Sequence, residues 1–397
     1  MPALTLADLV APVEVSHFFA AIQGKEHRRF PGAAGRFTDV LPWSALGAIL
    51  RQHRLEFPRL RLAKDGEPVP ATTYTEQVST RRNGVIPRMK AAPFAEQLRD
   101  GATLVLDSVD ELSDSVGDLA RRLEHGLRER VQVNLYAGCG VTHGFDVHWD
   151  DHDAFIIQLA GRKRWRMHGP TRPVPLHRDV EPPPSPPAEP IDEFMLEDGD
   201  VLYLPRGHWH DVASVGELSL HLTIGFNPAT GVDLVSWLAD QLRADELFRR
   251  DLPRFGSDQE RTEVAERLRT AIEAALTPDV VERFLTDRDA QAPAHPHVGL
   301  PWAAMPDPLP RGDEAEVRLL TPRAVLQRDG AAGRVVLLAA GKRFVFAEVI
   351  APLLEALLDG TPQPVKTLVE LVTPAVDPPK VRALLGELIT RGLLTVD

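Results

Sequence analysis

Two short histidine-containing runs in this sequence have the residue types and spacing of a metal site. His148 and Asp150 are separated by one residue, and His208 and His210 follow about sixty residues later. Residues two apart on a β-strand point to the same face, so His148 and Asp150 can reach one ion. Two imidazoles and one carboxylate that leave one side of the metal open are typical of non-haem Fe(II) oxygenases. The pattern therefore predicts such a site, with zinc as the alternative occupant.

The distal histidine is chosen by its place relative to a turn. His208 and His210 share one strand parity, so their spacing alone does not separate them. His208 directly follows the turn Pro205–Arg206–Gly207 and is expected in the loop, whereas His210 lies in the next strand. We predict His210 as the third ligand. Three neighbours are candidates for the surroundings of the metal or the substrate side: His143, His152 and Asp153.

A lysine follows the first metal-binding run on the next predicted strand. In the hairpin AFIIQLAGRKRWRMHG, Lys163 and Trp165 share one face, while Arg162, Arg164 and Arg166 share the other and are expected to face solvent. A lysine that faces into a barrel needs a counter-charge, because a buried ammonium is costly without one. A dianionic co-substrate such as 2-oxoglutarate would supply that charge.

Polar residues alternate with apolar ones on two further strands. LSLHLTIGFN places Ser219, His221 and Thr223 on one face and leucines and isoleucine on the other, and VQVNLYA places Asn134 and Tyr136 in the same manner. A face lined by hydroxyls, an imidazole and an amide is typical of a cavity wall. We therefore expect these residues to line the pocket.

The elements around these residues are short strands. Apolar runs with a period of two occupy residues 131–227, with Gly, Pro and Asp between them and no helical pattern, which predicts an antiparallel sandwich or barrel. Residues 1–130 read as helices and loops that cover it, with helices expected at 41–55 and 111–131. The proline-rich segment 181–190 is expected to be an exposed, stiff loop.

The chain is long enough for several domains. We predict a catalytic domain at 1–229, a helical domain at 230–291, a linker at 292–310 and a winged-helix-like domain at 311–397. Helices are expected at 233–248, 257–276 and 278–287, and Ser257 is a good helix start. In the last domain, strands at 317–327 and 334–340 precede helices at 346–360, 364–372 and 378–392. That domain has eleven basic and eleven acidic residues, so we expect no strong nucleic-acid binding.

Composition restricts the remaining classes of protein. The net charge of −12 disfavours a nucleic-acid binder and would suit a basic protein or peptide partner. No apolar run reaches the length of a membrane span, and the first residues do not resemble a secretory signal, so we expect a cytoplasmic protein. Cys139 is the single cysteine, which excludes an intrachain disulfide, and we expect it to be a small buried or loop residue.

The motifs together resemble a known family. Asn-x-Tyr followed by His-x-Asp, the run DDHDAFIIQLAGRKRWR, and LYLPRGHWHDV with SLHLT behind it are similar to the ribosomal oxygenase branch of the JmjC family, which has the cupin fold. The resemblance implies a double-stranded β-helix, Fe(II) on His148, Asp150 and His210, and activation of O₂. It also implies that Lys163 binds the 5-carboxylate of 2-oxoglutarate. Further co-substrate contacts would come from Asn134, His221 and Thr223.

The same resemblance implies a substrate and an assembly. The family hydroxylates histidine or arginine side chains of ribosomal proteins and dimerises through its helical unit, and the stripe Leu234, Val235, Trp237, Leu238 and Leu242 suits such a dimer. Three alternatives remain: a hydroxylase of a biosynthetic precursor peptide, a non-catalytic cupin scaffold, and a JmjC demethylase, for which the sequence offers no evident methyl-lysine cage.

Overall fold

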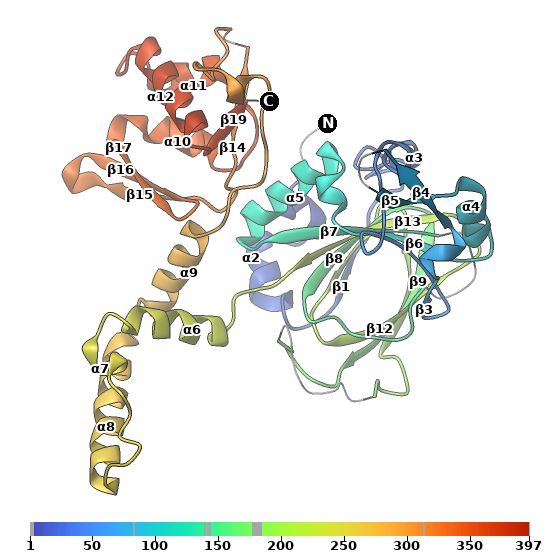
Figure 1. Cartoon of the computed structure of the whole chain (residues 1–397), viewed down its shortest axis with the longest axis horizontal. Helices are drawn as coiled ribbons and strands as arrows, with labels where there is room; N and C mark the ends of the chain where they lie inside the picture. The colour runs from blue at the N-terminus through green and yellow to red at the C-terminus, as the bar shows by residue number, and fades with distance from the viewer. Residues whose placement is uncertain are drawn as a thin grey trace. The chain divides into compact units, whose positions relative to one another are not determined.

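The computed structural model describes residues 4–81, 84–138, 140, 144–176, 185–312 and 314–396. Contacts within the chain group it into two units, Met1–Pro228 and Ala229–Asp397. Cys139, His143 and part of the proline-rich loop at 181–190 lie outside the described residues. Figure 1 gives the element labels used below. The finer division of residues 229–397 into a helical domain, a linker and a winged-helix-like domain stays a prediction.

The first unit is built on two antiparallel sheets. The larger has the strand order β1 (Arg28–Phe30), β11 (Val201–Leu204), β8 (Asp153–Ala160), β13 (Ser219–Phe226), β7 (Val131–Gly138), β6 (Thr103–Leu106), β2 (Leu60–Lys64) and β3 (Glu67–Pro68). The smaller has the order β10 (Asp192–Glu197), β9 (Arg162–Pro170) and β12 (His208–Ser214). Buried residues of both sheets, among them Ile156, Leu202, Trp165 and Met167, form one cluster. The predicted antiparallel β core is therefore confirmed.

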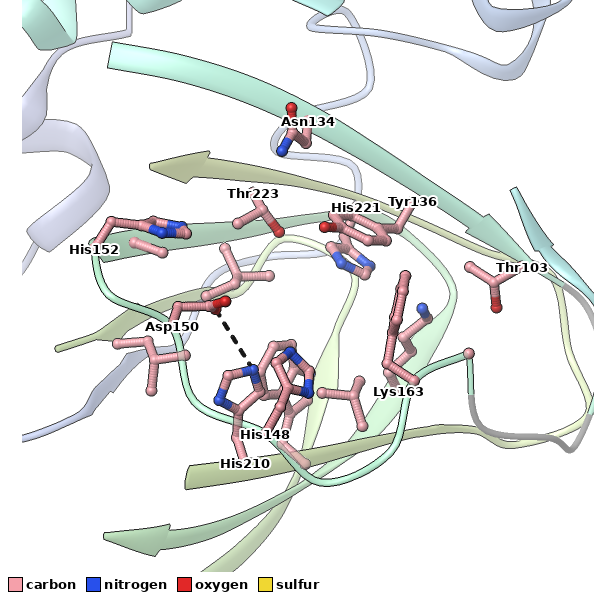
Figure 2. A pocket seen from close by; sticks show the side chains of 17 residues that line it. Thr103, Asn134, Tyr136, His148, Asp150, His152, Lys163, His210, His221 and Thr223 are labelled. Atoms are coloured by element: carbon pink, nitrogen blue, oxygen red, sulfur yellow. Dashed lines mark ion pairs between the residues drawn. The ribbon is translucent and has the colours of Figure 1, made fainter. Parts of the chain in front are cut away.

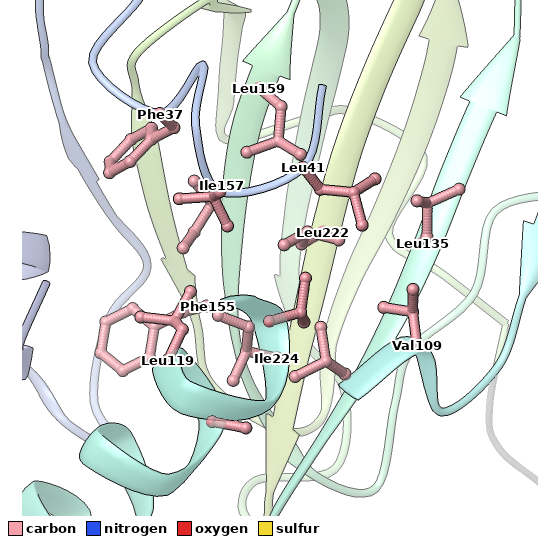
Figure 3. Packing of buried hydrophobic residues seen from close by; sticks show 14 of the residues in the cluster. Phe37, Leu41, Val109, Leu119, Leu135, Phe155, Ile157, Leu159, Leu222 and Ile224 are labelled. Atoms are coloured by element: carbon pink, nitrogen blue, oxygen red, sulfur yellow. The ribbon is translucent and has the colours of Figure 1, made fainter. Parts of the chain in front are cut away.

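Strand β8 is buried on both of its faces, and its alternate residues belong to two different apolar clusters. Phe155 and Ile157 point to the outer side of the larger sheet, where they join a large core that includes Leu119 (Figure 3). Ala154 and Ile156 point the other way, into the space between the sheets. A strand buried on both faces has a nearly continuous apolar sequence, and in FIIQLA only the buried Gln158 interrupts it.

Helices cover the outer side of the larger sheet, as predicted for α3 (Trp43–Gln52) and α5 (Asp114–Leu127). The other helices of this unit are α1 (Leu6–Val10), α2 (Val15–His17) and α4 (Ala91–Arg99). The prediction that residues 1–130 hold only helices and loops was wrong, because β1, β2, β3 and β6 belong to the main sheet and β4 (Thr75–Thr80) pairs with β5 (Gly84–Met89). Short strands show too few alternations of apolar and polar residues to be recognised from sequence. In β6 there is no alternation at all, because all four residues are buried.

The second unit begins with helices. They are α6 (Gly231–Leu242), α7 (Glu246–Arg249), α8 (Asp258–Ala275) and α9 (Val280–Ala290). Ser257 accepts a hydrogen bond from the backbone N–H of Glu260 and caps α8, as predicted. The helix expected at 233–248 is in fact two, because Asp245 caps a new start by accepting from the N–H of Leu247.

The rest of this unit combines three helices with short sheets. One sheet has the order β18 (Gln363–Pro364), β14 (Glu316–Leu319) and β19 (Leu394–Val396), and the other has β15 (Val325–Asp329), β16 (Arg334–Ala339) and β17 (Lys342–Ala347). Their helices are α10 (Ala351–Leu357), α11 (Val365–Val372) and α12 (Pro378–Thr390). The single strand expected at 317–327 is divided between β14 and β15.

One further expectation for this unit needs correction. The helix expected at 346–360 starts only at Ala351, with Pro352 in its first turn, and the preceding residues belong to β17 and a 3-10 turn. Within the predicted linker at 292–310, Leu309 is buried in the C-terminal core and Trp302 packs against that core. Across the described ranges, the helices are all too short or too polar to span a bilayer.

Phe155 tests the two-faced core. Its ring is fully buried, with ring centroids 5.3 Å from Tyr203 and 5.9 Å from Phe226. We expect Phe155→Ala to lower the free energy of unfolding by about 3–5 kcal/mol, because the variant leaves a cavity that the neighbours cannot fill. Urea unfolding followed by tryptophan fluorescence checks this. Leu218→Ala, at a site that is 62% exposed, is the matched control and should stay within about 0.5 kcal/mol.

Candidate metal and co-substrate site

A backbone pairing brings the two metal-binding runs together. The N–H of His148 donates to the carbonyl of His210 (3.1 Å), and the N–H of His210 donates back to the carbonyl of His148 (2.8 Å). Asp150 is fixed beside them, because its carbonyl accepts from the N–H of Gly207 (2.8 Å). One ligand atom from each of His148, Asp150 and His210 lies within 4.8 Å of the other two. Figure 2 shows these side chains converging at one side of the pocket.

Both imidazoles are turned so that Nε2 is free. The Nδ1 atom of His148 lies 2.7 Å from the carbonyl oxygen of Asp146, and that of His210 lies 3.1 Å from the carbonyl oxygen of His208. Because a carbonyl only accepts, each Nδ1 carries the proton and leaves the lone pair on Nε2 for a metal. Burial, followed by the neighbouring His148, lowers the pKa of His210 to about 4. It is therefore neutral at pH 7, the form that binds metals.

The carboxylate of Asp150 is held in its charged form. Burial alone would raise its pKa, but His210, His152 and His148 together bring the pKa below its usual value. Its Oδ2 lies 3.8 Å from Nε2 of His210. Two imidazoles and one carboxylate, grouped on one side of a cavity, match the ligand preference of a divalent transition metal.

A β-bulge separates the two candidate distal histidines. The expectation that His208 remains in the loop was wrong, because β12 begins at that residue. Its pairing with β9 runs from Trp209 opposite Gly169 to His210 opposite Met167, which skips one residue of β9. The extra residue of this bulge, His168, therefore belongs to β9 and not to β12. His208 lies against His27, at 6.2 Å between ring centroids, and the structure brings His210 to His148 and Asp150.

The triad opens into a pocket of about 730 Å³, mouth included. Asn134, Lys163, His221 and Thr223, all expected around the co-substrate, line it. Tyr136, Trp165 and His152, which were also predicted on or near this site, line the pocket as well. The sequence did not predict the remaining lining residues, which are Thr103, Gly144, Phe145, Ala154, Ile156, Leu204 and Val212. Thr103 was missed because β6 was not recognised as a strand of the main sheet.

Lys163 is the buried cation of this pocket. It is only 5% exposed, and within the described ranges no acidic group pairs with it and no hydrogen bond satisfies it. Burial lowers the pKa of Lys163 to about 8. The arginines next to it face outward as expected: Arg162 pairs with Glu217 at 2.9 Å and Arg166 with Glu193 at 3.0 Å. The pocket therefore holds a positive charge that calls for an anionic ligand.

Aromatic and imidazole rings form the wall beside Lys163. Tyr136 and His221 are stacked at 4.9 Å between ring centroids, with an angle of 9° between the planes. Burial, followed by Lys163, lowers the pKa of His221 well below its usual value, so its ring is neutral. The indole N–H of Trp165 and Nδ1 of His221 are buried without a partner in the described residues. Both are available to a bound molecule.

Three other candidate residues, Asn134, Asp153 and His152, either make contacts that support the strands or lie at the edge of the pocket. Asn134 accepts from the backbone N–H of Ser108 (3.1 Å), which fixes its amide. Asp153 points away from the metal ligands and accepts from the hydroxyl of Tyr203 (2.6 Å). His152 lines the pocket near Asp150, and a Cβ atom on Gly225 would lie 2.8 Å from its ring.

Comparison with known proteins agrees with this geometry. Residues 115–234 match the family described as the JmjC domain. This part of the chain is therefore similar to a JmjC domain. Ribosomal oxygenase 2 of Rattus norvegicus is 34% identical over 161 residues, which cover 38% of this chain and 34% of that protein. Ribosomal oxygenase 1 of Homo sapiens is 28% identical over 266 residues, 62% of this chain and 39% of that protein. The matches thus span less than half the length of either relative.

Solved structures extend the likeness in fold beyond the JmjC domain. Escherichia coli YcfD superposes with a TM-score of 0.58 at 19% identity, covering 97% of this chain and 98% of that one. A second structure of YcfD, described as a ribosomal oxygenase in complex with cobalt and 2-oxoglutarate, gives a TM-score of 0.56 at 19% identity, covering 97% and 99%. The chain therefore has the same fold as YcfD, in agreement with the cupin-type fold that the sequence motifs implied.

The different neighbours of His208 and His210 lead to a direct test of the metal ligands. We expect His210→Ala to weaken Mn(II) binding by on the order of a hundredfold or more, because even outer contacts of metal sites are worth ten- to a hundredfold. His208→Ala, two residues away on the same strand, should leave the Mn(II) affinity unchanged. Titration calorimetry of both variants checks this. The reverse result would move the third ligand to His208.

Proposed function

We propose that this chain is an Fe(II)- and 2-oxoglutarate-dependent oxygenase that hydroxylates a side chain of a protein, specifically a histidine or arginine of a ribosomal protein. One observation carries the proposal: His148, Asp150 and His210 share one cavity with Lys163, which has no partner of its own in the described chain. A metal-binding triad alone suits several reactions, but a triad beside a buried cation suits a metal that works with an anionic co-substrate.

The residues present fit both groups. The triad would hold Fe(II) from one side, and Lys163 would pair with the distal carboxylate of 2-oxoglutarate. When bound, Fe(II) and 2-oxoglutarate supply the oxidising power that uses O₂ to hydroxylate an unactivated carbon. The chain itself contributes position and exclusion of water. Ile156, Leu204 and Val212 form apolar walls of the pocket.

The charge of the chain supports a basic protein substrate. The net charge of −12 attracts basic partners over a distance, and ribosomal proteins are strongly basic as a class. Relatives of the JmjC domain are named ribosomal oxygenases, and one from Drosophila persimilis, 26% identical over 222 residues, is named a bifunctional lysine-specific demethylase and histidyl-hydroxylase. A biosynthetic precursor peptide would use the same site, and only substrate identification separates the two.

Lys163 gives a test of the co-substrate assignment. We expect Lys163→Ala to raise the apparent KM for 2-oxoglutarate by one to two orders of magnitude, because a charge contact of this kind contributes on the order of 2–3 kcal/mol. Lys163→Arg should retain part of the function, since the charge remains but its shape differs. Arg164→Ala, which removes an outward-facing charge, is the control.

Lys163 should also make the affinity for 2-oxoglutarate depend on pH. With a pKa of about 8 in the unliganded pocket, Lys163 is charged below that pH and neutral above it. Binding of 2-oxoglutarate needs the charged form, so its affinity should fall by up to about tenfold for each pH unit above 8. Below pH 8, Lys163 should cause no change in the affinity for 2-oxoglutarate. A Lys163→Ala variant with wild-type affinity and wild-type pH dependence would contradict the assignment.

We also propose that the helical part of the second unit forms a homodimer. Helix α8 has no buried residue along its eighteen positions, although Ile272 and other apolar side chains lie on it. On α6, Val232 and Val235 are 57% and 61% exposed. The stripe expected from sequence needs correction, because Trp237 packs on Phe284 and Leu238 is buried within the unit. The exposed valines of α6 are the better candidates for a partner surface.

Charged substitution of an exposed valine tests this dimer. We expect Val235→Glu to produce monomers, because a carboxylate in an apolar interface is costly to desolvate. Sedimentation velocity of the full chain is the measurement. Val85→Glu, at an equally exposed valine of β5, should leave the assembly unchanged. A wild-type chain that sediments as a monomer would refute the dimer.

A further inference from the structure

The first unit has a second cavity, between the end of α3 and the β4–β5 hairpin, whose labels lie close together in Figure 1. Residues 50–55 line one side of it, and Val78 with residues 86–89 lines the other. Its volume is about 1030 Å³, mouth included, and it shares no lining residue with the metal pocket. We call this cavity the hairpin groove. A space of this size can hold several side chains of a binding partner.

The hairpin groove combines apolar and basic lining residues. The half-buried ones are apolar: Leu50, Leu55, Val78, Ile86, Pro87 and Met89. The exposed ones are polar or basic: Arg51, Gln52, His53, Arg54 and Arg88. No aspartate or glutamate is among the described lining residues. The groove therefore has an aliphatic floor and a positively charged rim.

The charge of this rim is opposite to that of the whole chain, which has a net charge of −12. Among the described residues, Arg54 is the one arginine of the rim in an ion pair, with Glu56 at 3.0 Å. Arg88 lies opposite Glu76 in the β4–β5 pairing, so Glu76 is the acidic side chain that competes with a ligand for it. A basic substrate of the metal pocket would be repelled here. The rim thus suits a different, anionic partner.

We propose that the hairpin groove binds an acidic peptide segment of a partner protein. Carboxylates of the segment bind Arg51 and Arg88, because the planar guanidinium group matches a carboxylate with two hydrogen bonds. One large apolar side chain of the segment packs on the floor, where the flexible thioether of Met89 adapts to its shape. This binding site is separate from the metal pocket, and the inference does not depend on the proposed function.

Three features favour a peptide over other anions. The described lining has no phenylalanine, tyrosine or tryptophan on which the bases of a single-stranded RNA could stack. Arginines stand on both sides of the groove, which suits several carboxylates better than the single headgroup of an amphiphile. Pro87, in the middle of β5, lacks an N–H, so recognition falls to side chains and not to the addition of a full partner strand.

The test begins with selection from a random peptide library on the full chain, compared with selection on an Arg51→Ala, Arg88→Ala double variant. We expect the wild type alone to enrich peptides that combine several acidic residues with one large apolar residue. The affinity of the most enriched peptide is then measured by fluorescence anisotropy. Each single arginine variant should weaken its binding by about tenfold, and added salt should weaken it too.

Matched variants separate the groove from general surface charge. Arg99→Ala should leave peptide binding unchanged, because Arg99 is exposed in the last turn of α4 as Arg51 is in the last turn of α3. Glu76→Gln should strengthen binding by roughly two- to threefold, since it removes the competing carboxylate. Ile86→Ala should weaken it by roughly tenfold through lost apolar contact. Unchanged Mn(II) affinity in each variant shows that the fold is intact.

Three results would overturn the proposal. The first is an identical selection on the wild type and on the double variant. The second is a selected peptide whose affinity does not respond to Arg51→Ala or Arg88→Ala. The third is a structured RNA that displaces the peptide and binds more tightly, which would make the groove a nucleic-acid site.

Discussion

The site depends on one reciprocal pair of backbone hydrogen bonds, between His148 and His210. These residues are about sixty positions apart in sequence, and the pair fixes the distance between their imidazoles at 4.3 Å between ring centroids. A backbone carbonyl then orients each ring, and the N–H of Gly207 holds the backbone of Asp150. The metal ligands are therefore positioned by main-chain pairing on rigid strands, which holds a site more precisely than mobile loops would.

The second constraint is the buried charge of Lys163. A buried ammonium without a counter-ion is unfavourable, and the fold bears that cost in the same cavity as the metal ligands. An anionic co-substrate relieves the cost when it binds, so binding is favoured without any change in the surrounding strands. The unfavourable burial of the Lys163 charge thus contributes to the affinity for an anionic co-substrate.

Much of this could be predicted from sequence, because strand alternation is regular. The inward positions of His221, Thr223 and Lys163 followed from a period of two, and these residues line the pocket as expected, whereas Ser219 does not. What could not be predicted came from irregular or short elements. The choice of His210 over His208 rested on a loop position for His208, whereas β12 begins at that residue. Thr103 lies on a four-residue strand, too short for periodicity to reveal.

The central claim is that this pocket uses 2-oxoglutarate and O₂ to hydroxylate a ribosomal protein. The most direct test incubates ribosomal proteins from cells that lack the chain with the purified protein, Fe(II), 2-oxoglutarate and ¹⁸O₂, followed by peptide mass spectrometry. We predict that one histidine- or arginine-containing peptide gains a single ¹⁸O atom, and that it gains none with the Asp150→Ala variant. Consumption of 2-oxoglutarate with no labelled ribosomal peptide would contradict the account.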